Sequence, residues 1–344
     1  MSKEKKKGLS TFFRIVIVLL LIIVILLGAA YFYVKNKFDK IQQVELPSEE
    51  ELGITDTISE NLTGYRNVAI FGVDSRSDDY GVGNRSDCII IASINNDTGE
   101  IKLISVYRDT YVNIDGYGLD KITHAYSYGE APLAIKTLNK NLDLNIDEFV
   151  TVNFDAVVEA VDQLGGIQLN ITADEIKYIN GYIQATSKVT GKTSKQITVP
   201  GTYTVDGVQA VAYCRIRYTE GGDYKRAERM RTVIEAMFNK IKTKNLAEIN
   251  LFADSILPHV YTNITVKDII SMVPSMAKYK VTESIGWPYD TRGKTMDRWY
   301  GIPITLESNV TQLHKEAFGE EDYIPSDTVK SISQSIINKT GYTK

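Results

Sequence analysis

The most informative feature of this sequence is a concentration of arginine in one short stretch. Five of the twelve arginines of the chain fall within residues 214–231: Arg215, Arg217, Arg226, Arg229 and Arg231. A guanidinium group is planar, always charged, and offers its donors in a fork that matches phosphate oxygens. Because the whole chain has a net charge of −4, this stretch indicates a specific anion site rather than a generally basic surface.

The second half of the stretch has the spacing of a helix over residues 223–242. Its apolar residues form one stripe: Met230, Val233, Ile234, Met237 and Ile241. On a wheel turning about 100° per residue, Arg226 falls about 40° from Met230, within the stripe, whereas Arg229 and Arg231 fall about 100° away, on its edges. We therefore expect Arg226 to point into the protein at the first turn of the helix.

An inward arginine needs a negative partner, because a buried guanidinium without an anion or acceptors is strongly destabilising. A helix N-terminus also favours negative charge, so a bound anion fits this position. The alternative is a structural ion pair with Asp223 or Glu228. We favour the anion because the arginines of the stretch outnumber the acids near them.

Three further clusters pair an acid with an arginine at the ends of predicted strands. They follow residues 67–71, precede residues 88–94 and follow residues 101–106, and their charged members are Asp74, Arg76, Arg85, Asp87, Arg108 and Asp109. Loops converge at strand ends in α/β proteins, so these side chains are candidates for one site. Carboxylates of this kind suit a hard cation such as Mg²⁺, which in turn bridges phosphate oxygens.

The elements that must position these residues alternate along the chain, which predicts one α/β domain. Further strands are predicted at 149–154, 167–171 and 280–285, and helices at 131–142, 155–164, 246–257, 266–278 and 327–337. The polar residues 180–199 are expected to form a surface excursion. The pattern at 205–213 fits neither a helix nor a strand clearly.

The N-terminus has the pattern of a membrane anchor. A lysine-rich tail, residues 1–14, precedes an uncharged apolar run, residues 15–34, long enough to span about 30 Å as a helix. Positive charge on the short side predicts a cytoplasmic tail and places an extracellular domain, residues 63–344, beyond an acidic, exposed spacer at 35–62. The alternative is a cleaved signal peptide, since residues 28–30 are small.

Other classes of site are not expected. The net negative charge argues against a nucleic-acid partner. Two cysteines and three histidines occur without metal-ligand spacing, which argues against a zinc site. We interpret Cys88 and Cys214 as small buried residues and His124 as a packed or capping histidine.

The ordered motifs GVDSR, NRSD, YRDT, DKITHAY, VDGVQAVAYCRIRYT and GGDYKRAERMR, between residues 67 and 242, resemble those of the LytR-CpsA-Psr family. This resemblance implies a membrane-anchored enzyme of a bacterial, typically Gram-positive, cell envelope. Such an enzyme transfers a glycopolymer, such as wall teichoic acid or capsular polysaccharide, from a polyprenyl-pyrophosphate carrier to peptidoglycan as a phosphodiester. The implied fold is α/β/α with a central mixed sheet, a lipid pocket, an arginine-lined mouth and a Mg²⁺ ion.

The resemblance also implies roles for individual residues. Asp74 and Asp87 match the acids that hold the metal, and with Arg108 they form the expected catalytic group. The expected pyrophosphate-binding residues are Arg76, Arg85, Lys121, Arg215, Arg217, Arg226 and Arg229. One departure is Met230, which stands where the family commonly has glutamine.

The sequence leaves the identity of the general base open between Asp74 and Asp87. It also leaves two other functions open. The domain could retain lipid pyrophosphate as a sensor without transferring it, or it could hydrolyse the pyrophosphate with water as the acceptor.

Overall fold

A seven-stranded mixed sheet forms the centre of the computed structural model, which describes residues 42–75, 78–265, 268, 272 and 275–343. The strand order is β1-β10-β7-β2-β3-β4-β11, and these strands are Gln42–Gln43, Tyr261–Thr262, Glu148–Val152, Tyr65–Val73, Ser86–Asn95, Glu100–Val106 and Lys280–Trp287. Strands β2, β3 and β4 are antiparallel to one another, whereas β7 runs parallel to β2 and β11 parallel to β4. The expected mixed sheet is confirmed, as are the strands predicted at 67–71, 88–94, 101–106 and 280–285.

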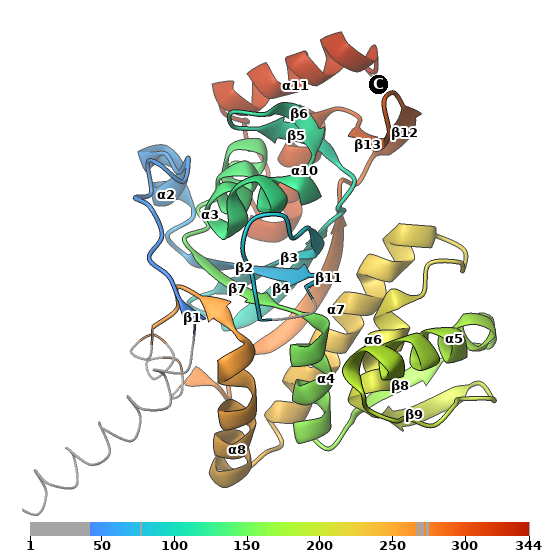
Figure 1. The fold of residues 1–344 in the computed structure, drawn as a ribbon. Coiled ribbons are helices and arrows are strands. Elements are labelled where there is room, and N and C mark those ends of the chain that lie inside the picture. The colour runs from blue at the N-terminus through green and yellow to red at the C-terminus, as the bar shows by residue number, and fades with distance from the viewer. Residues whose placement is uncertain (1–41, 76–77, 266–267, 269–271, 273–274, 344) are drawn as a thin grey trace, which may run out of the picture. The chain divides into compact units, whose positions relative to one another are not determined.

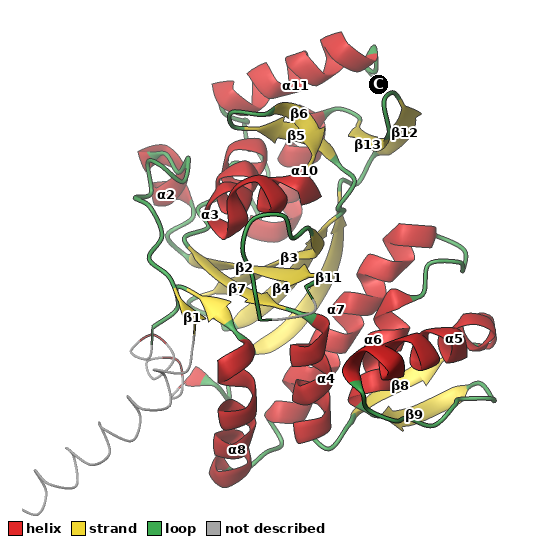
Figure 2. Cartoon of the chain, in the orientation of Figure 1, coloured by secondary structure: helices red, strands yellow, loops and turns green. Residues whose placement is uncertain are grey.

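Helices cover both faces of this sheet (Figures 1 and 2). The helices of one face are α3 (Thr123–Leu142), α10 (Leu306–Phe318) and α11 (Asp327–Thr340), which lie with the hairpins β5–β6 (Tyr111–Ile114, Gly118–Lys121) and β12–β13 (Thr291–Thr295, Trp299–Pro303). The helices of the other face are α4 (Phe154–Gln163), α5 (Ala173–Thr190), α6 (Gly207–Arg215), α7 (Gly222–Ile241) and α8 (Leu246–Ile256), which lie with the hairpin β8–β9 (Ile167–Ile171, Gly201–Val205).

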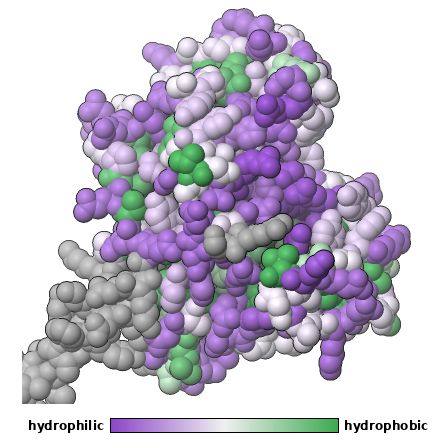
Figure 3. Space-filling model, in the orientation of Figure 1, coloured by the Kyte–Doolittle hydropathy of each residue, from purple (hydrophilic) through white to green (hydrophobic). Residues whose placement is uncertain are grey.

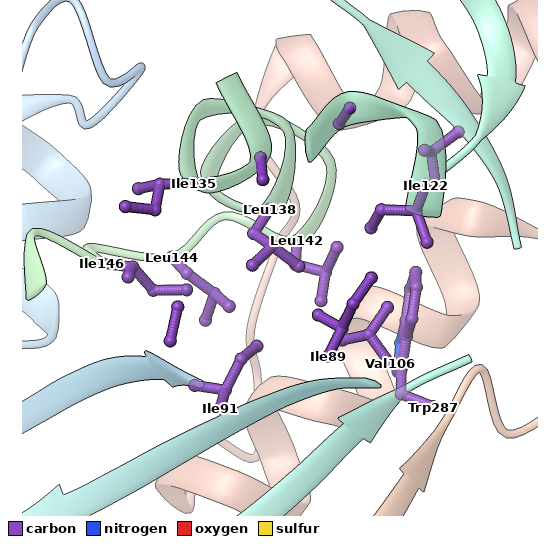
Figure 4. Close-up of a cluster of buried hydrophobic side chains, with 14 of the residues drawn as sticks. Ile89, Ile91, Val106, Ile122, Ile135, Leu138, Leu142, Leu144, Ile146 and Trp287 are labelled. Carbon is purple, nitrogen blue, oxygen red and sulfur yellow. The ribbon is translucent and has the colours of Figure 1, made fainter. Parts of the chain in front are cut away.

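Alternation of side chains along the central strands divides the core into two clusters. Ile89 and Ile91 of β3 point toward α3, where they meet residues such as Leu138 and Leu142 (Figure 4). Their neighbour Ile90 points to the opposite face and joins the cluster under α4, α6 and α7. A strand buried on both faces reads as a continuous apolar run, which is why the sequence CIIIASI predicted β3 correctly.

Two segments of the α4–α7 face differ from the sequence expectation. The supposed excursion at 180–199 is in its first half the end of α5, which begins with a capping box between Thr172 and Glu175 and buries Ile179 and Ile183. The ambiguous residues 205–213 contain most of α6, which also begins with a capping box, from Asp206 to Gln209. Helix α6 lacks an amphipathic pattern because almost all of it is buried.

The acidic segment expected as an exposed spacer at 35–62 is in part a piece of the domain. Residues 56–61 form the short helix α2 (Asp56–Asn61), and Leu52, Ile58 and Leu62 are buried in the core beneath α3. Its acids are on the outside, and the apolar residues between them are inside, so composition alone gave the wrong interpretation.

Some expectations fall wholly or partly on residues that the structure does not describe. The tail at 1–14 and the membrane helix at 15–34 lie outside the described residues, as does most of the helix predicted at 266–278. Within the described part of the chain, no helix combines the length and the apolar character needed to cross a bilayer.

Candidate active site

The candidate site lies at one edge of the sheet, where β2 ends, β3 begins and β4 ends. Because these neighbouring strands are antiparallel, the register Val73 to Ser86 and Ile90 to Ser105 brings the clusters after β2, before β3 and after β4 together. The N-terminal turn of α7 reaches the same edge. The sequence prediction that the strand-end clusters converge with the arginine stretch is therefore confirmed for Asp87, Arg108, Arg217 and Arg226.

Asp87 is the centre of the cluster. Its Oδ1 accepts from Nη1 of Arg108 at 2.8 Å, and its Oδ2 accepts from Nη2 of Arg226 at 3.2 Å and from Nη2 of Arg217 at 3.4 Å. Burial by itself would raise the pKa of Asp87, but Arg226 and Arg108 outweigh burial and hold that pKa below its ordinary value. Asp87 is thus an ionised carboxylate in a ring of three guanidinium groups.

Arg226 points inward, as the helical wheel predicted, and its side chain is only 2% exposed. It also contacts Asp223 of its own helix, with Nη1 at 3.4 Å from Oδ1, so the alternative of an ion pair with Asp223 holds as well. Asp223 in turn lies 3.3 Å from Nε of Arg108. Two carboxylates therefore hold three arginines in place.

Arg217 lies in the same cluster as two other guanidinium groups, which share Asp87 with it. Burial lowers the pKa of the Arg217 guanidinium, and repulsion from Arg226 and Arg108 lowers this pKa further. The nearby carboxylates Asp87 and Asp223 raise it, but not enough to offset the other two effects. A ligand with two or more negative charges would relieve this repulsion.

Beside the cluster lies a polar cavity of about 430 Å³, hereafter the polar cavity. It is lined by Asp74, Gly83, Asn84, Arg85, Asp87, Arg108 and Arg217. Asp74 and Arg85, both expected at the site, are exposed here. On the face that Figure 3 shows, hydrophilic side chains predominate and apolar ones are scattered.

On the other side of Asp87 lies an apolar cavity of about 180 Å³, hereafter the apolar cavity. It is enclosed by β2, β3, α4, α6, α7 and α8, and its lining includes Val157, Val211, Met230, Ile234, Phe252 and Ile256. Cys88 and Cys214 also line it, and burial raises the pKa of both thiols to about 12, which keeps them neutral. Both cysteines are free; Cys214 is buried, as expected, whereas Cys88 is half-buried.

Met230 lies where the two environments meet. It is 7% exposed, and it lines both the apolar cavity and the narrow space between Asp87, Arg108 and Arg226. The sequence placed Met230 at the centre of the apolar stripe of α7, and that position is confirmed. A thioether here extends the apolar lining up to the arginines.

Two of the expected anion-binding arginines are engaged elsewhere. Arg229 is buried, pairs with Glu175 of α5 at 2.8 Å, and donates to the Ile216 carbonyl and to Oγ1 of Thr219. It therefore links α7 to α5. Its position at the edge of the helical stripe is compatible with this role, but counting only the acids near it in sequence did not reveal Glu175 as its partner.

Arg215 likewise lies away from the cluster around Asp87. It donates to Oγ1 of Thr186 at 3.0 Å and packs against the rings of Phe154 and Tyr182. Arg76 lies outside the described residues. Lys121 is near the site, held by Asp109 at 2.6 Å.

A smaller polar cavity of about 170 Å³ adjoins the first and shares Arg85, Asp87 and Arg108 with it. Its other lining residues are Asp109, Lys121, Thr123, His124 and Arg298. Sequence reasoning missed Arg298, which belongs to the turn between β12 and β13 and is distant in sequence from every motif. Its only local signal is a charged pair, Asp297-Arg298, which is common in exposed turns.

The donors for a Mg²⁺ ion fit only in part. Asp74 and Asp87 line the same cavity and offer carboxylate oxygens, which this ion prefers. Within the described residues no group of three or more His, Cys, Asp or Glu side chains is arranged to hold a metal. Further ligands would have to be water or oxygens of a bound anion.

Comparisons with known proteins agree with this architecture. The model of the LytR_cpsA_psr family matches residues 29–313. The polyisoprenyl-teichoic acid–peptidoglycan teichoic acid transferase TagT of Bacillus subtilis (strain 168) is 32% identical over 234 residues, which cover 66% of this chain and 69% of that protein. The transferase TagU of Bacillus licheniformis is 36% identical over 207 residues, covering 59% and 61%.

A solved structure described as TagT bound to LIIa-WTA has the same fold, with a TM-score of 0.56 and 25% identity, and the match covers 82% of this chain and 92% of that one. The family match extends over most of the chain and includes every motif of the candidate site. This chain is therefore a member of the LytR-CpsA-Psr family.

Proposed function

We propose that this protein transfers a glycopolymer from a polyprenyl-pyrophosphate carrier to peptidoglycan and forms a phosphodiester link. The observation that carries the proposal is that one carboxylate, Asp87, lies between an apolar cavity and a ring of arginines. That arrangement matches a ligand with a hydrocarbon tail and a doubly charged head. The names of TagT and TagU, which are teichoic acid transferases, support it.

The apolar cavity would hold part of the prenyl chain. Its lining is almost entirely aliphatic and aromatic, and hydrocarbon gains about 25 cal/mol for each Å² removed from water. Met230 would contact the last isoprene unit before the pyrophosphate. The thioether sulfur has no hydrogen to donate to the phosphate, so the arginines must supply the donors.

The arginines would hold the pyrophosphate and stabilise the charge that develops as the phosphoryl group is transferred. Phosphoryl transfer depends mainly on positioning and charge neutralisation. In the structure Arg108, Arg217 and Arg226 share Asp87 as an acceptor, and phosphate oxygens would take over some of these hydrogen bonds. Arg85 and Lys121 lie on the same side of the cluster and would extend the contact to the glycan phosphate.

We include a Mg²⁺ ion in the proposal, held by Asp74 and Asp87 together with phosphate oxygens. When bound, it would neutralise charge on the pyrophosphate. We also propose that residues 15–34 anchor the protein in the plasma membrane with residues 1–14 in the cytoplasm, so that the site faces peptidoglycan outside the cell.

Two other functions are compatible with the same ligand, namely sensing of lipid pyrophosphate and its hydrolysis. Transfer is favoured over sensing because the acidic residues Asp74 and Asp87 lie beside the arginines. A protein that only binds an anion needs no carboxylate there. The products of the reaction distinguish transfer from hydrolysis.

Ligand binding tests this proposal directly. The full-length chain in detergent should bind a short prenyl pyrophosphate at least about 100-fold more tightly than the matching prenyl alcohol or inorganic pyrophosphate, since both halves contribute. Arg217→Ala should weaken the binding of prenyl pyrophosphate but not the binding of prenyl alcohol. Arg66→Ala is a matched control, because Arg66 also forms a half-buried ion pair, with Glu148, at the far end of β2. Equal binding of prenyl alcohol and prenyl pyrophosphate would contradict the proposal.

A further inference from the structure

The smaller polar cavity contains a histidine whose surroundings are those of a proton acceptor. His124, in the first turn of α3, is 7% exposed and lines this cavity. Its Nδ1 lies 2.8 Å from Oδ2 of Asp120. Among the described residues, no hydrogen-bond partner is found for its other ring nitrogen, Nε2.

Asp120 fixes which nitrogen carries the proton. Its Oδ1 accepts from the backbone N–H of Lys121 and its Oδ2 from the hydroxyl of Tyr128, each at 2.8 Å. Burial would raise the pKa of Asp120, but the hydrogen bond from His124 and these two others outweigh burial and hold the pKa below its ordinary value. An ionised Asp120 accepts from Nδ1–H, so a neutral His124 has its lone pair on Nε2.

The position of this cavity relative to the arginines suggests a role for His124 and Asp120. The two polar cavities share Arg85, Asp87 and Arg108, whereas the apolar cavity shares only Asp87 with the smaller one, so a group in the smaller cavity would reach a phosphate held by these arginines from a side other than the lipid's. We propose that the smaller cavity receives the acceptor hydroxyl and that His124, oriented by Asp120, takes its proton. This inference rests on the proposed function.

The surroundings also suit a sugar as the acceptor. Tyr117 and Tyr128 stack at 4.3 Å beside Asp120, and Tyr117 is 56% exposed, which leaves an aromatic surface near the cavity. The charged groups facing the cavity are Asp120 behind the histidine ring and, along the lining, Arg85, Asp87, Arg108, Asp109, Lys121 and Arg298. The excess of cations would favour an acceptor that carries a carboxylate.

The proposed step is a displacement at the phosphorus that bears the glycan. The acceptor O–H bond breaks, its proton goes to Nε2 of His124, and its oxygen forms a bond to the phosphorus that bears the glycan. The bond from that phosphorus to the bridging oxygen breaks, and the prenyl phosphate leaves with the electron pair. The imidazolium, stabilised by Asp120, then releases its proton to water.

Transfer kinetics of the full-length chain with a synthetic prenyl-pyrophosphoryl sugar and a muramic glycan fragment test this role. His124→Gln should lower kcat about 10²- to 10⁴-fold, the usual range for loss of a general base, with unchanged donor binding. The acid limb of the pH profile of kcat seen in the wild type should be absent from the variant. His259→Gln is the matched control, because His259 also pairs with an aspartate, Asp78, at 2.9 Å but does not line the cavity.

A second variant covers the case in which His124→Gln does not fold. Asp120→Asn should lower kcat and change the acid limb, because Nδ1–H loses the carboxylate that orients the ring. Either variant with wild-type kcat, or with an unchanged acid limb, would overturn the inference even if donor binding is normal. Failure of the wild type to bind the donor would instead overturn the proposed function, and the inference with it.

Discussion

At the scale of single residues, three arginines share one carboxylate, and this sharing has consequences for activity and for stability. Arg217 is the most exposed of the three, with 41% of its side chain accessible, and it is crowded by the other two. Arg226 is almost fully buried and has a partner on each side. The same cluster therefore contains a residue that can be removed at little structural cost and one that cannot.

We predict that Arg217→Ala lowers the rate of transfer on the order of 10³-fold, by analogy with other arginines that stabilise phosphoryl transfer. The melting temperature should stay close to that of the wild type, because the side chain is substantially exposed. Steady-state kinetics and thermal unfolding of the variant, beside Arg66→Ala, check both parts. A rate within tenfold of wild type would exclude Arg217 from the phosphate contacts.

We predict that Asp87→Asn destabilises the domain by about 3 kcal/mol at neutral pH, the usual cost of leaving a buried charge without its partner. The folded-state pKa of Asp87 is depressed below its ordinary value of 3.8, so its contribution is present above that pH and is lost as pH falls through the folded pKa. Urea unfolding of both proteins from neutral pH to below 3.8 should show the difference shrinking. A difference that does not change with pH would contradict this account of the carboxylate.

At the scale of elements, α7 connects the site to the rest of the fold through different faces. Arg226 faces the cluster, Met230 faces the apolar cavity and Arg229 faces α5. The wheel drawn from the sequence predicted the inward direction of Arg226, because that direction depends only on helical spacing. It did not predict the partner of Arg229, because Glu175 is more than fifty residues away and belongs to a helix that composition concealed.

We predict that Glu175→Gln destabilises the fold by about 3–5 kcal/mol, because it leaves Arg229 buried without a counter-ion. Transfer by the protein that stays folded should change little, since neither residue reaches the cluster around Asp87. Denaturant unfolding and the kinetics of the folded fraction test the two statements. A large loss of kcat without a loss of stability would restore Arg229 to the list of phosphate ligands.

We predict different effects for two replacements of Met230. Met230→Leu should cost less than about 1.5 kcal/mol of stability, as volume-conserving changes do, and should keep the binding of prenyl pyrophosphate. Met230→Gln restores the amide common in the family but places it against an apolar lining, which should cost about 1–3 kcal/mol unless the amide finds a partner. Unfolding and prenyl-alcohol binding distinguish the two, and equal behaviour would mean that Met230 does not line the lipid path.

At the scale of the whole molecule, most strands of the central sheet could be predicted from the sequence, whereas much of the structure around the site could not. Apolar runs such as CIIIASI predict buried strands, and ordered motifs predict which strand ends meet. Helix α5, the packed residues 52–62 and the turn carrying Arg298 were missed, because each is polar or acidic locally and is positioned only by contacts with distant parts of the chain. Most residues that line the cavity beside His124 belong to sequence motifs, but Arg298 reaches it only through such distant contacts.

Product analysis with the full-length wild-type chain, Mg²⁺, a labelled prenyl-pyrophosphoryl sugar and peptidoglycan fragments distinguishes transfer from hydrolysis and from sensing. We predict one prenyl phosphate released for each sugar joined to peptidoglycan through a phosphodiester. Free sugar phosphate without a peptidoglycan adduct would show hydrolysis, and bound but unchanged donor would show sensing. Either result would contradict transfer as the function of this site.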